Sequence, residues 1–230
     1  MPAVDLILIR HGQPDWFPGG LGSNDPHLTD LGLRQASRLT AVAKRWGPVD
    51  QLWVSPLRRA GETAAPLAEA LHLDPRVEEW TAEIANPPEW EGSPIDLIED
   101  AWIRGNLRPL EEMWEGMPGG ESFRDFHQRV VGGLEEAFRQ LGIERLEDGY
   151  PHLWEAPSDY RIAVVAHGGT NAVILGALLG LEPTPWEWDR FDSPHTGVAR
   201  LTTLSIAHGS AFSLRAFADV THLEEGMVTK

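Results

Sequence analysis

Two short apolar runs constrain the fold of this chain more than any other feature: Leu6–Ile9 near the N-terminus and the run within Arg161–Ala166. A strand that is apolar on both faces is typical of a parallel sheet covered by helices on either side. Stretches with helical periodicity alternate with such strands along the chain. This order predicts an α/β fold, a three-layer sandwich with a mostly parallel central sheet and helices on both faces.

The remaining elements follow from helix caps, breaker residues and periodicity. Val49–Val54 and Arg76–Trp80 predict further strands, and Gly197–Ala207 with Ala211–Ala218 predicts a C-terminal hairpin. We expect helices over residues 29–47, 57–71, 123–138 and 172–179. Together these elements predict one domain over residues 1–230.

Two segments depart from this alternation. Residues 85–120 contain five prolines and three tryptophans, and they predict an inserted cap of short helices and loops. We expect Trp90, Trp102 and Trp114 to form the core of that cap rather than to stack on a substrate. Residues 141–160 are polar and irregular, which predicts a surface loop.

Composition excludes several classes of partner. The formal net charge of −16 argues against nucleic acid or an anionic membrane surface. There is no cysteine, which excludes disulfides and thiolate metal sites, and no apolar run approaches membrane-spanning length. We therefore expect a soluble, cytoplasmic protein, with a homodimer left open, that gathers its positive charge in one pocket for a small anion.

Both apolar strands end in a histidine followed by glycine. Arg10-His11-Gly12 follows the first strand, and His167-Gly168 follows the strand that ends at Ala166. Open α/β sheets bind ligands at the carboxyl ends of their strands, so the two imidazoles should face one crevice. Gly168 also leads into a helix N-terminus, which favours an anion.

Arginines complete this pattern. Arg10 precedes His11, and Arg58-Arg59 begin the helix that follows the second strand, at the same end of the sheet. A guanidinium group binds phosphoryl oxygens through two parallel hydrogen bonds and keeps its charge. We expect one of Arg58 and Arg59 to point inward, and the residues alone thus indicate a phosphoryl site.

The ordered motifs resemble the histidine phosphatase superfamily, also called phosphoglycerate mutase-like proteins. The resemblance implies a phosphomonoesterase that acts on a small phosphorylated metabolite, with no metal ion and no cofactor. It spans roughly residues 4–205 and rests on Arg10-His11-Gly12, Asp25 to Gly32, Ser55 to Ala64, Glu83-Ile84 with Trp90-Glu91-Gly92, Pro118 to Ser122, and Val165 to Gly169.

The resemblance also implies a role for each matching residue. His11 matches the nucleophile that takes the phosphoryl group. Arg10, Arg59 and His167 match the pocket that holds this group, and Arg59, not Arg58, stands at the family position. Glu83 matches the proton donor. The expected product of the first step is a covalent phosphohistidine, which water activated by Glu83 then hydrolyses.

Other positions complete the predicted pocket. Gln13, Ser23 and Gly168 fall where family members line it, and the late strand brings His195 to its edge. The interval from Glu83 to Trp90 is one residue longer than the family pattern. Four neighbouring acids therefore stay alternatives for the proton donor: Glu78, Glu79, Glu89 and Glu91.

The chemistry requires opposite protonation states of the two central groups. The imidazole of His11 must be neutral, and the positive charges of Arg10 and Arg59 should lower its pKa. Its other ring nitrogen needs an acceptor, which we expect to be a backbone carbonyl in the loop. Glu83 must be protonated to neutralise the leaving oxygen, and a bound phosphate raises its pKa in that direction.

Two other functions compete with the phosphatase. A phosphoglycerate mutase would return the phosphoryl group to the bound product, but Phe17 follows Trp16 where family members often have asparagine. The segment Glu89 to Glu121 is also acidic and lacks the basic insertion of the mutases. A non-catalytic sensor of phosphorylated ligands is disfavoured because binding alone would not require His11 and Glu83 together.

Overall fold

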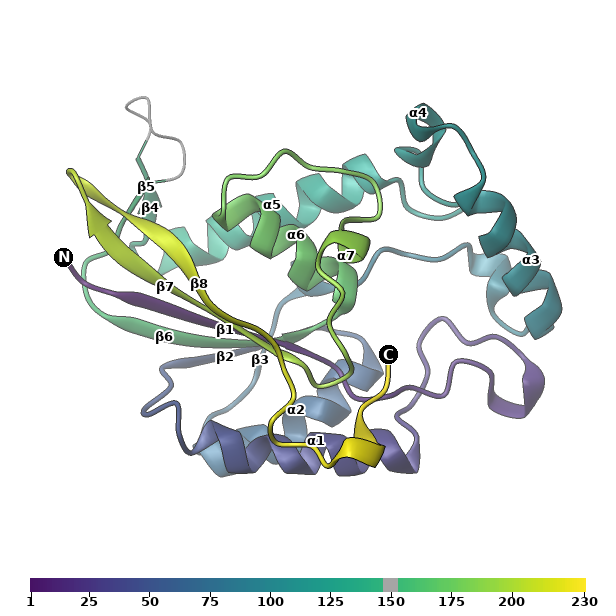
Figure 1. Cartoon of the computed structure of the whole chain (residues 1–230), viewed down its shortest axis with the longest axis horizontal. Coiled ribbons are helices and arrows are strands. Elements are labelled where there is room, and N and C mark those ends of the chain that lie inside the picture. The colour runs from purple at the N-terminus through teal and green to yellow at the C-terminus, as the bar shows by residue number, and fades with distance from the viewer. Residues whose placement is uncertain (147–152) are drawn as a thin grey trace.

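The computed structural model describes residues 1–146 and 153–230 and is built around one mixed β-sheet (Figure 1). Its eight described strands lie in the order β3-β2-β6-β1-β7-β8-β5-β4. Their bounds are β1 Val4–Arg10, β2 Gln51–Val54, β3 Arg76–Val77, β4 Glu144–Arg145, β5 Leu153–Glu155, β6 Tyr160–Ala166, β7 Val198–Ile206 and β8 Gly209–Asp219.

The sheet is not mostly parallel, which corrects the prediction. Strands β3, β2, β6 and β1 are parallel, whereas four of the seven described neighbour pairs, all beyond β1, are antiparallel. The physical reason lies in the connection between β7 and β8, which consists of Ala207 and His208. Two residues join only antiparallel strands, and β7 pairs with β1 directly. The predicted hairpin therefore joins the sheet beside β1, with β7 antiparallel to β1 and β8 antiparallel to β7.

Helices cover both faces of this sheet (Figure 1). Helices α1 (Asp30–Ala43) and α2 (Arg58–Leu71) lie on one face, and α5 (Phe123–Gln140) and α6 (Gly168–Leu178) lie on the other. Thr29 caps α1 by accepting a hydrogen bond from the Gly32 amide, and Ser122 caps α5 in the same way through the Asp125 amide.

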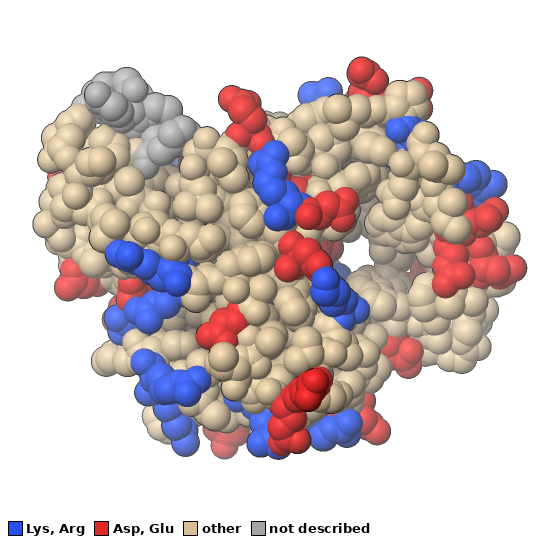
Figure 2. Space-filling model, in the orientation of Figure 1, with Lys and Arg blue, Asp and Glu red and all other residues tan. Residues whose placement is uncertain are grey.

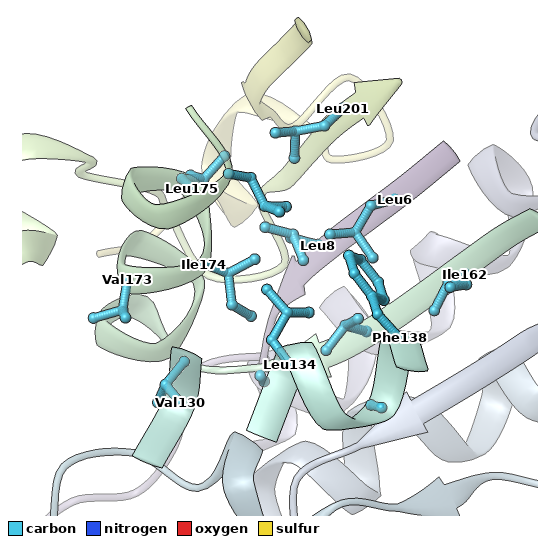
Figure 3. Close-up of a cluster of buried hydrophobic side chains, with 14 of the residues drawn as sticks. Leu6, Leu8, Val130, Leu134, Phe138, Ile162, Val173, Ile174, Leu175 and Leu201 are labelled. Atoms are coloured by element: carbon cyan, nitrogen blue, oxygen red, sulfur yellow. The ribbon is translucent and has the colours of Figure 1, made fainter. Parts of the chain in front are cut away.

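Strand β1 joins the two hydrophobic cores because successive side chains of a strand point to opposite faces. Leu6 and Leu8 belong to the cluster under α5 and α6, and Ile7 and Ile9 belong to the cluster against α1 and α2. Figure 3 shows Leu6 and Leu8 facing the side chains of α5, among them Leu134. With both its faces buried, β1 holds the residues that follow it rigidly.

Short helices fill the segment predicted as a cap. They are η3 (Pro88–Trp90), α3 (Ile95–Asn106) and α4 (Leu110–Met113), and they lie beyond the end of the sheet toward which β1 runs (Figure 1). No described helix is long and apolar enough to cross a membrane. The remaining short helices are η1 Pro18–Gly20, η2 Glu79–Thr81, α7 Glu187–Arg190 and η4 Glu225–Met227.

Three predicted elements differ in extent. The surface loop over 141–160 contains the antiparallel pair β4 and β5, which extends the sheet from β8, while residues 147–152 of that prediction lie outside the described residues. Strands of two and three residues are too short to show periodicity. The third strand ends at Val77, and η2 follows it. Helix α6 begins at Gly168, directly after His167, rather than at residue 172.

Candidate active site

The carboxyl ends of the parallel strands open into a pocket of about 1080 Å³. His11 follows β1 and His167 follows β6, and these neighbouring strands pair Arg10 with Ala166 in register. The two imidazoles therefore meet, with ring centroids 5.1 Å apart. The structure thus brings together the two histidines that the strand ends predicted.

The loop after β1 is fixed by close packing on two helices. A Cβ on Gly12 would lie 2.7 Å from the carbonyl oxygen of Gly32 in α1, so no other residue fits there without movement. The Gly12 amide donates to Thr63 Oγ1 of α2 at 2.9 Å. These contacts fix the Gly12 carbonyl beside the His11 ring.

Two hydrogen bonds define the tautomer of His11. Its Nδ1 lies 2.7 Å from the Gly12 carbonyl oxygen, which can only accept, so Nδ1 carries the proton. Its Nε2 accepts from Nε of Arg59 at 3.2 Å and therefore holds a lone pair. Burial, and then the charges of Arg59 and Arg10, lower the pKa of His11 well below its usual value. The backbone acceptor expected for Nδ1 is confirmed. The expected lowering of the His11 pKa is confirmed as well, but burial contributes more to it than the two arginines do.

The two inward arginines are held differently. Arg59 lies in the first turn of α2, is 2% exposed, and stacks over the Trp16 ring at 4.8 Å. Arg10 donates from Nη1 to the Ser193 carbonyl at 2.5 Å, and its buried Nε has no partner among the described residues. Burial lowers the pKa of Arg59 to about 10, so it keeps its charge at neutral pH. Arg58 points away and contacts exposed His27 instead.

His167 presents an unused donor to the same space. Ser55 Oγ accepts from the Leu57 amide at 3.3 Å and lies 2.7 Å from Nε2 of His167. The hydroxyl can donate to Nε2, and in that tautomer the ring proton of His167 is on Nδ1. This Nδ1 is buried without a described partner. Burial and the charge of Arg59 lower the pKa of His167 well below its usual value. A neutral imidazole with a free N–H is suited to bind an anionic oxygen.

Glu83 places its carboxyl group at the N-terminus of α6. It accepts hydrogen bonds from the amides of Gly169 at 2.9 Å, Thr170 at 3.2 Å and Ile84 at 3.1 Å. Burial raises the pKa of Glu83, while the Gly169 amide and the charge of Arg59 oppose this effect. Of the four alternative acids, only Glu79 also lines the pocket.

The remaining predicted residues divide into two groups. Gly168 lines the pocket, and the ring of His195 lies 5.7 Å from that of His11. Burial and then the charge of Arg10 lower the pKa of His195 to about 3. Like His167, His195 contacts the site through His11 without lining the pocket, and Gln13 and Ser23 also lie outside the lining. The side-chain oxygen of Gln13 accepts from Thr29 Oγ1 at 2.9 Å, and Ser23 is held through its amide by the Trp16 carbonyl.

The structure also gives roles at the site to residues for which the sequence predicted none. Trp188 and Trp102 line the pocket, so Trp102 does more than fill the cap. Arg129 donates to the carbonyls of Trp80 and Ala82, and so fixes the turn that leads to Glu83. Its place next to the phosphatase motifs was visible in the sequence, but the distant turn that it binds was not. No local signal indicated Trp188.

The described residues contain no cluster of three or more histidine, aspartate or glutamate side chains that could hold a metal ion. Arg10, Arg59, His11 and Glu83 line one space, and the guanidinium groups supply positive charge there. The imidazole of His167 packs against that of His11. This arrangement can bind a phosphoryl group, attack it with an imidazole and deliver a proton to the opposite side.

Comparisons with known proteins agree with this geometry. The family model of the histidine phosphatase superfamily (branch 1) matches residues 6–219. Phosphoserine phosphatase 1 of Hydrogenobacter thermophilus is 35% identical over 182 residues, which cover 78% of this chain and 78% of that protein. A glucosyl-3-phosphoglycerate phosphatase of Mycolicibacterium vanbaalenii is 29% identical over 79% of this chain and 76% of its own length.

The fold matches solved structures as well. The structure of mycobacterial hydrolase 2 superposes with a TM-score of 0.72 at 24% identity and covers 98% of this chain and 95% of its own. The chain therefore belongs to the histidine phosphatase superfamily, as its motifs predicted.

Proposed function

We propose that this phosphomonoesterase of the histidine phosphatase superfamily hydrolyses a small-molecule phosphate ester without a metal ion, through a phosphohistidine on His11. The observation that carries the proposal is the tautomer of His11. Its Nδ1 proton is bound to the Gly12 carbonyl, and its Nε2 lone pair lies beside the Arg59 guanidinium. A nucleophile and the charge that binds its target are thus adjacent.

In the first step, Nε2 of His11 attacks phosphorus and the bond to the ester oxygen breaks. Arg10, Arg59 and the Nδ1 proton of His167 bind the phosphoryl oxygens, whose charge they stabilise while the group is transferred. Protonated Glu83 donates its proton to the leaving oxygen, and the alcohol departs. The phosphohistidine and the Glu83 carboxylate remain.

In the second step, Glu83 accepts a proton from water, whose oxygen attacks phosphorus. The bond between phosphorus and Nε2 breaks, inorganic phosphate leaves, and both side chains return to their starting states. Burial already raises the pKa of Glu83, and a bound phosphate dianion raises it further because like charges disfavour ionisation. A protonated donor in the substrate complex follows from these two effects.

Relatives support the substrate class. The two named relatives are phosphatases of phosphoserine and of glucosyl-3-phosphoglycerate, both small phosphorylated metabolites, and they match this chain over more than three quarters of its length. We also propose that residues 1–230 act as one domain in which the cap over residues 85–120 helps to enclose the substrate. The position of Trp102 in the pocket lining supports that role.

Phosphate release from p-nitrophenyl phosphate by purified protein, with chelator present, tests the proposal. We expect turnover and an acid-labile phosphoprotein, both lost in His11→Ala. Interconversion of phosphoglycerates without net phosphate release would indicate a mutase instead. Tight binding of phosphate esters without turnover or phosphoprotein would indicate a sensor, and would contradict the proposed function.

A further inference from the structure

We propose, resting on the phosphatase function above, that the substrate's alcohol half is bulky, carries no anionic group and binds against Trp188 and Trp102. The region concerned is the outer pocket, which we define by Glu79, Asn86, Trp102, Trp188 and Asp189. It continues outward from the phosphoryl site formed by the histidines and the two inward arginines. Its shape and its charges both restrict what can leave as the alcohol.

Trp188 lies next to the proton donor. A Cβ on Gly169 would lie 2.5 Å from Oε1 of Glu83 and 2.8 Å from Cε3 of Trp188, so both side chains border the same point at the start of α6. The leaving oxygen must reach the Glu83 carboxyl group to be protonated. The atoms attached to that oxygen therefore pass along the indole of Trp188.

Trp188 and Trp102 both line the pocket, and buried Trp186 packs between them behind the lining. The ring of Trp188 is 5.1 Å from that of Trp186, which is 6.1 Å from that of Trp102 in α3. Figure 2 shows the molecule hollowed on this side, between the α3–α4 segment and the body of the protein. The pocket of about 1080 Å³ is slightly larger than the range of roughly 300–1,000 Å³ that is typical of small-molecule sites. A three-carbon alcohol would leave most of this wall uncovered.

Every lining cation outside the phosphoryl site is already paired among the described residues. Arg129 donates from Nε and Nη2 to the Glu121 carboxylate, at 2.9 and 2.8 Å, and from Nη1 to two backbone carbonyls. Lys230 forms an ion pair with Asp192. A substrate carboxylate would have to displace Glu121 from Arg129, which leaves that acid unpaired, or share Lys230 with Asp192, whose negative charge reduces the attraction.

The unpaired charges of the outer pocket are negative. The carboxylates of Glu79 and Asp189 line it, and neither has a hydrogen bond or ion pair with any residue that the structure describes. A second anion on the substrate would be repelled by both. Hydroxyl groups, in contrast, can donate to these carboxylates and to the amide oxygen of Asn86. An aromatic wall beside acceptors fits a ring that carries hydroxyl groups.

Matched esters test charge and size separately. Glycerol 3-phosphate and 3-phosphoglycerate share their carbon skeleton and differ by a hydroxymethyl group against a carboxylate. We expect kcat/KM to be about tenfold or more higher for glycerol 3-phosphate. Glucose 6-phosphate, with an uncharged ring, should exceed glycerol 3-phosphate by about tenfold. Equal or higher kcat/KM for 3-phosphoglycerate, or no gain with the ring, would overturn the proposal.

A charge reversal in the outer pocket tests the cause. Asp189→Lys should raise kcat/KM for 3-phosphoglycerate relative to glycerol 3-phosphate by about five- to tenfold, because it supplies a free cation. Glu69→Lys is the matched control, since Glu69 is exposed on α2 and lies outside the pocket lining. The same change in both variants would assign the effect to net charge and would contradict the proposed subsite.

Turnover of p-nitrophenyl phosphate separates this proposal from the one on which it rests. If wild-type protein hydrolyses this ester and His11→Ala does not, the phosphatase function holds. The comparison of the matched esters then tests only the proposal about the substrate's alcohol half. No phosphate release from any ester would overturn both.

Discussion

The phosphoryl site and the outer pocket are parts of one cavity but are built in different ways. His11, His167 and Arg59 are at most 2% exposed and sit at strand ends or in the first turn of a helix. Glu79 and Asp189, in contrast, are exposed and lie on single-turn helices. The sheet and the helices that follow it therefore fix the two histidines and Arg59, while short connecting elements set the shape around the leaving alcohol. Substitutions should affect rate in the first region and substrate choice in the second.

The largest effect is expected from Arg59→Lys. Lysine replaces the planar guanidinium fork with a single ammonium nitrogen, which cannot bind two phosphoryl oxygens in parallel or stack flat on Trp16. We expect kcat to fall by roughly 10²–10³-fold. Arg58→Lys is the matched control, because Arg58 points toward exposed His27, and it should keep the wild-type rate. Steady-state kinetics of both variants would contradict the inward role of Arg59 if the two losses were equal.

Glu83→Gln should lower kcat/KM for glycerol 3-phosphate by about 100-fold, because the alkoxide then leaves unprotonated. The loss should be smaller with p-nitrophenyl phosphate, whose phenolate is a good leaving group.

The dependence of kcat/KM on pH tests the same role of Glu83. The wild type needs Glu83 protonated, so kcat/KM should fall as pH rises through its raised pKa. At low pH the limit is protonation of His11, whose pKa is well below its usual value.

In the glutamine variant the fall at high pH should disappear while the fall at low pH stays. If kcat/KM of the variant still falls at both low and high pH, the proton donor is another group. Glu79 is the remaining candidate in the pocket lining among the acids that the sequence left open.

Ser55→Ala should lower kcat by about tenfold. In the tautomer that the proposed function requires, the hydroxyl donates to Nε2 of His167, and without it the imidazole can shift its own proton away from the phosphoryl site. Nitrogen chemical shifts of His167 should then show a mixed tautomer. Ser37→Ala, the control, removes a hydroxyl from the exposed part of α1 and should change neither kcat nor the nitrogen chemical shifts of His167. A normal tautomer with lower kcat would contradict this explanation.

Trp102→Ala should have the smallest effect on rate. We expect kcat for glycerol 3-phosphate to stay within about threefold of wild type, and KM for glucose 6-phosphate to rise several-fold because the ring loses its wall. Trp114→Ala, which removes a tryptophan packed on Phe123 outside the pocket lining, should leave that KM unchanged. Thermal unfolding checks that both variants are folded. If kcat of Trp102→Ala fell as far as that of Arg59→Lys, the outer pocket would affect rate as strongly as the phosphoryl site does, which would contradict the proposed division.

The sequence predicted the parallel half of the sheet because β1, β2 and β6 are apolar, buried strands that alternate with helices along the chain. It could not predict the antiparallel half as part of the same sheet. Nothing local to Val198–Ile206 indicates that this strand pairs with β1, and β4 and β5 are too short to leave a pattern. Direction in a sheet depends on which edge a hairpin joins, and that choice is made by long-range packing.

The same division holds within the pocket. The sequence pattern placed His11 and His167, since each directly follows a buried strand that ends at the pocket. Between Arg58 and Arg59 the pattern left the choice open, and the resemblance to the family favoured Arg59. Only the tertiary structure decided which nitrogen of His11 is free, because a carbonyl of the loop and a guanidinium of α2 settle it together. Only the tertiary structure brought Trp102 and Trp188 to one wall, 86 positions apart in the chain. A motif encodes local backbone geometry and chemistry, whereas an outer wall arises where separate segments pack.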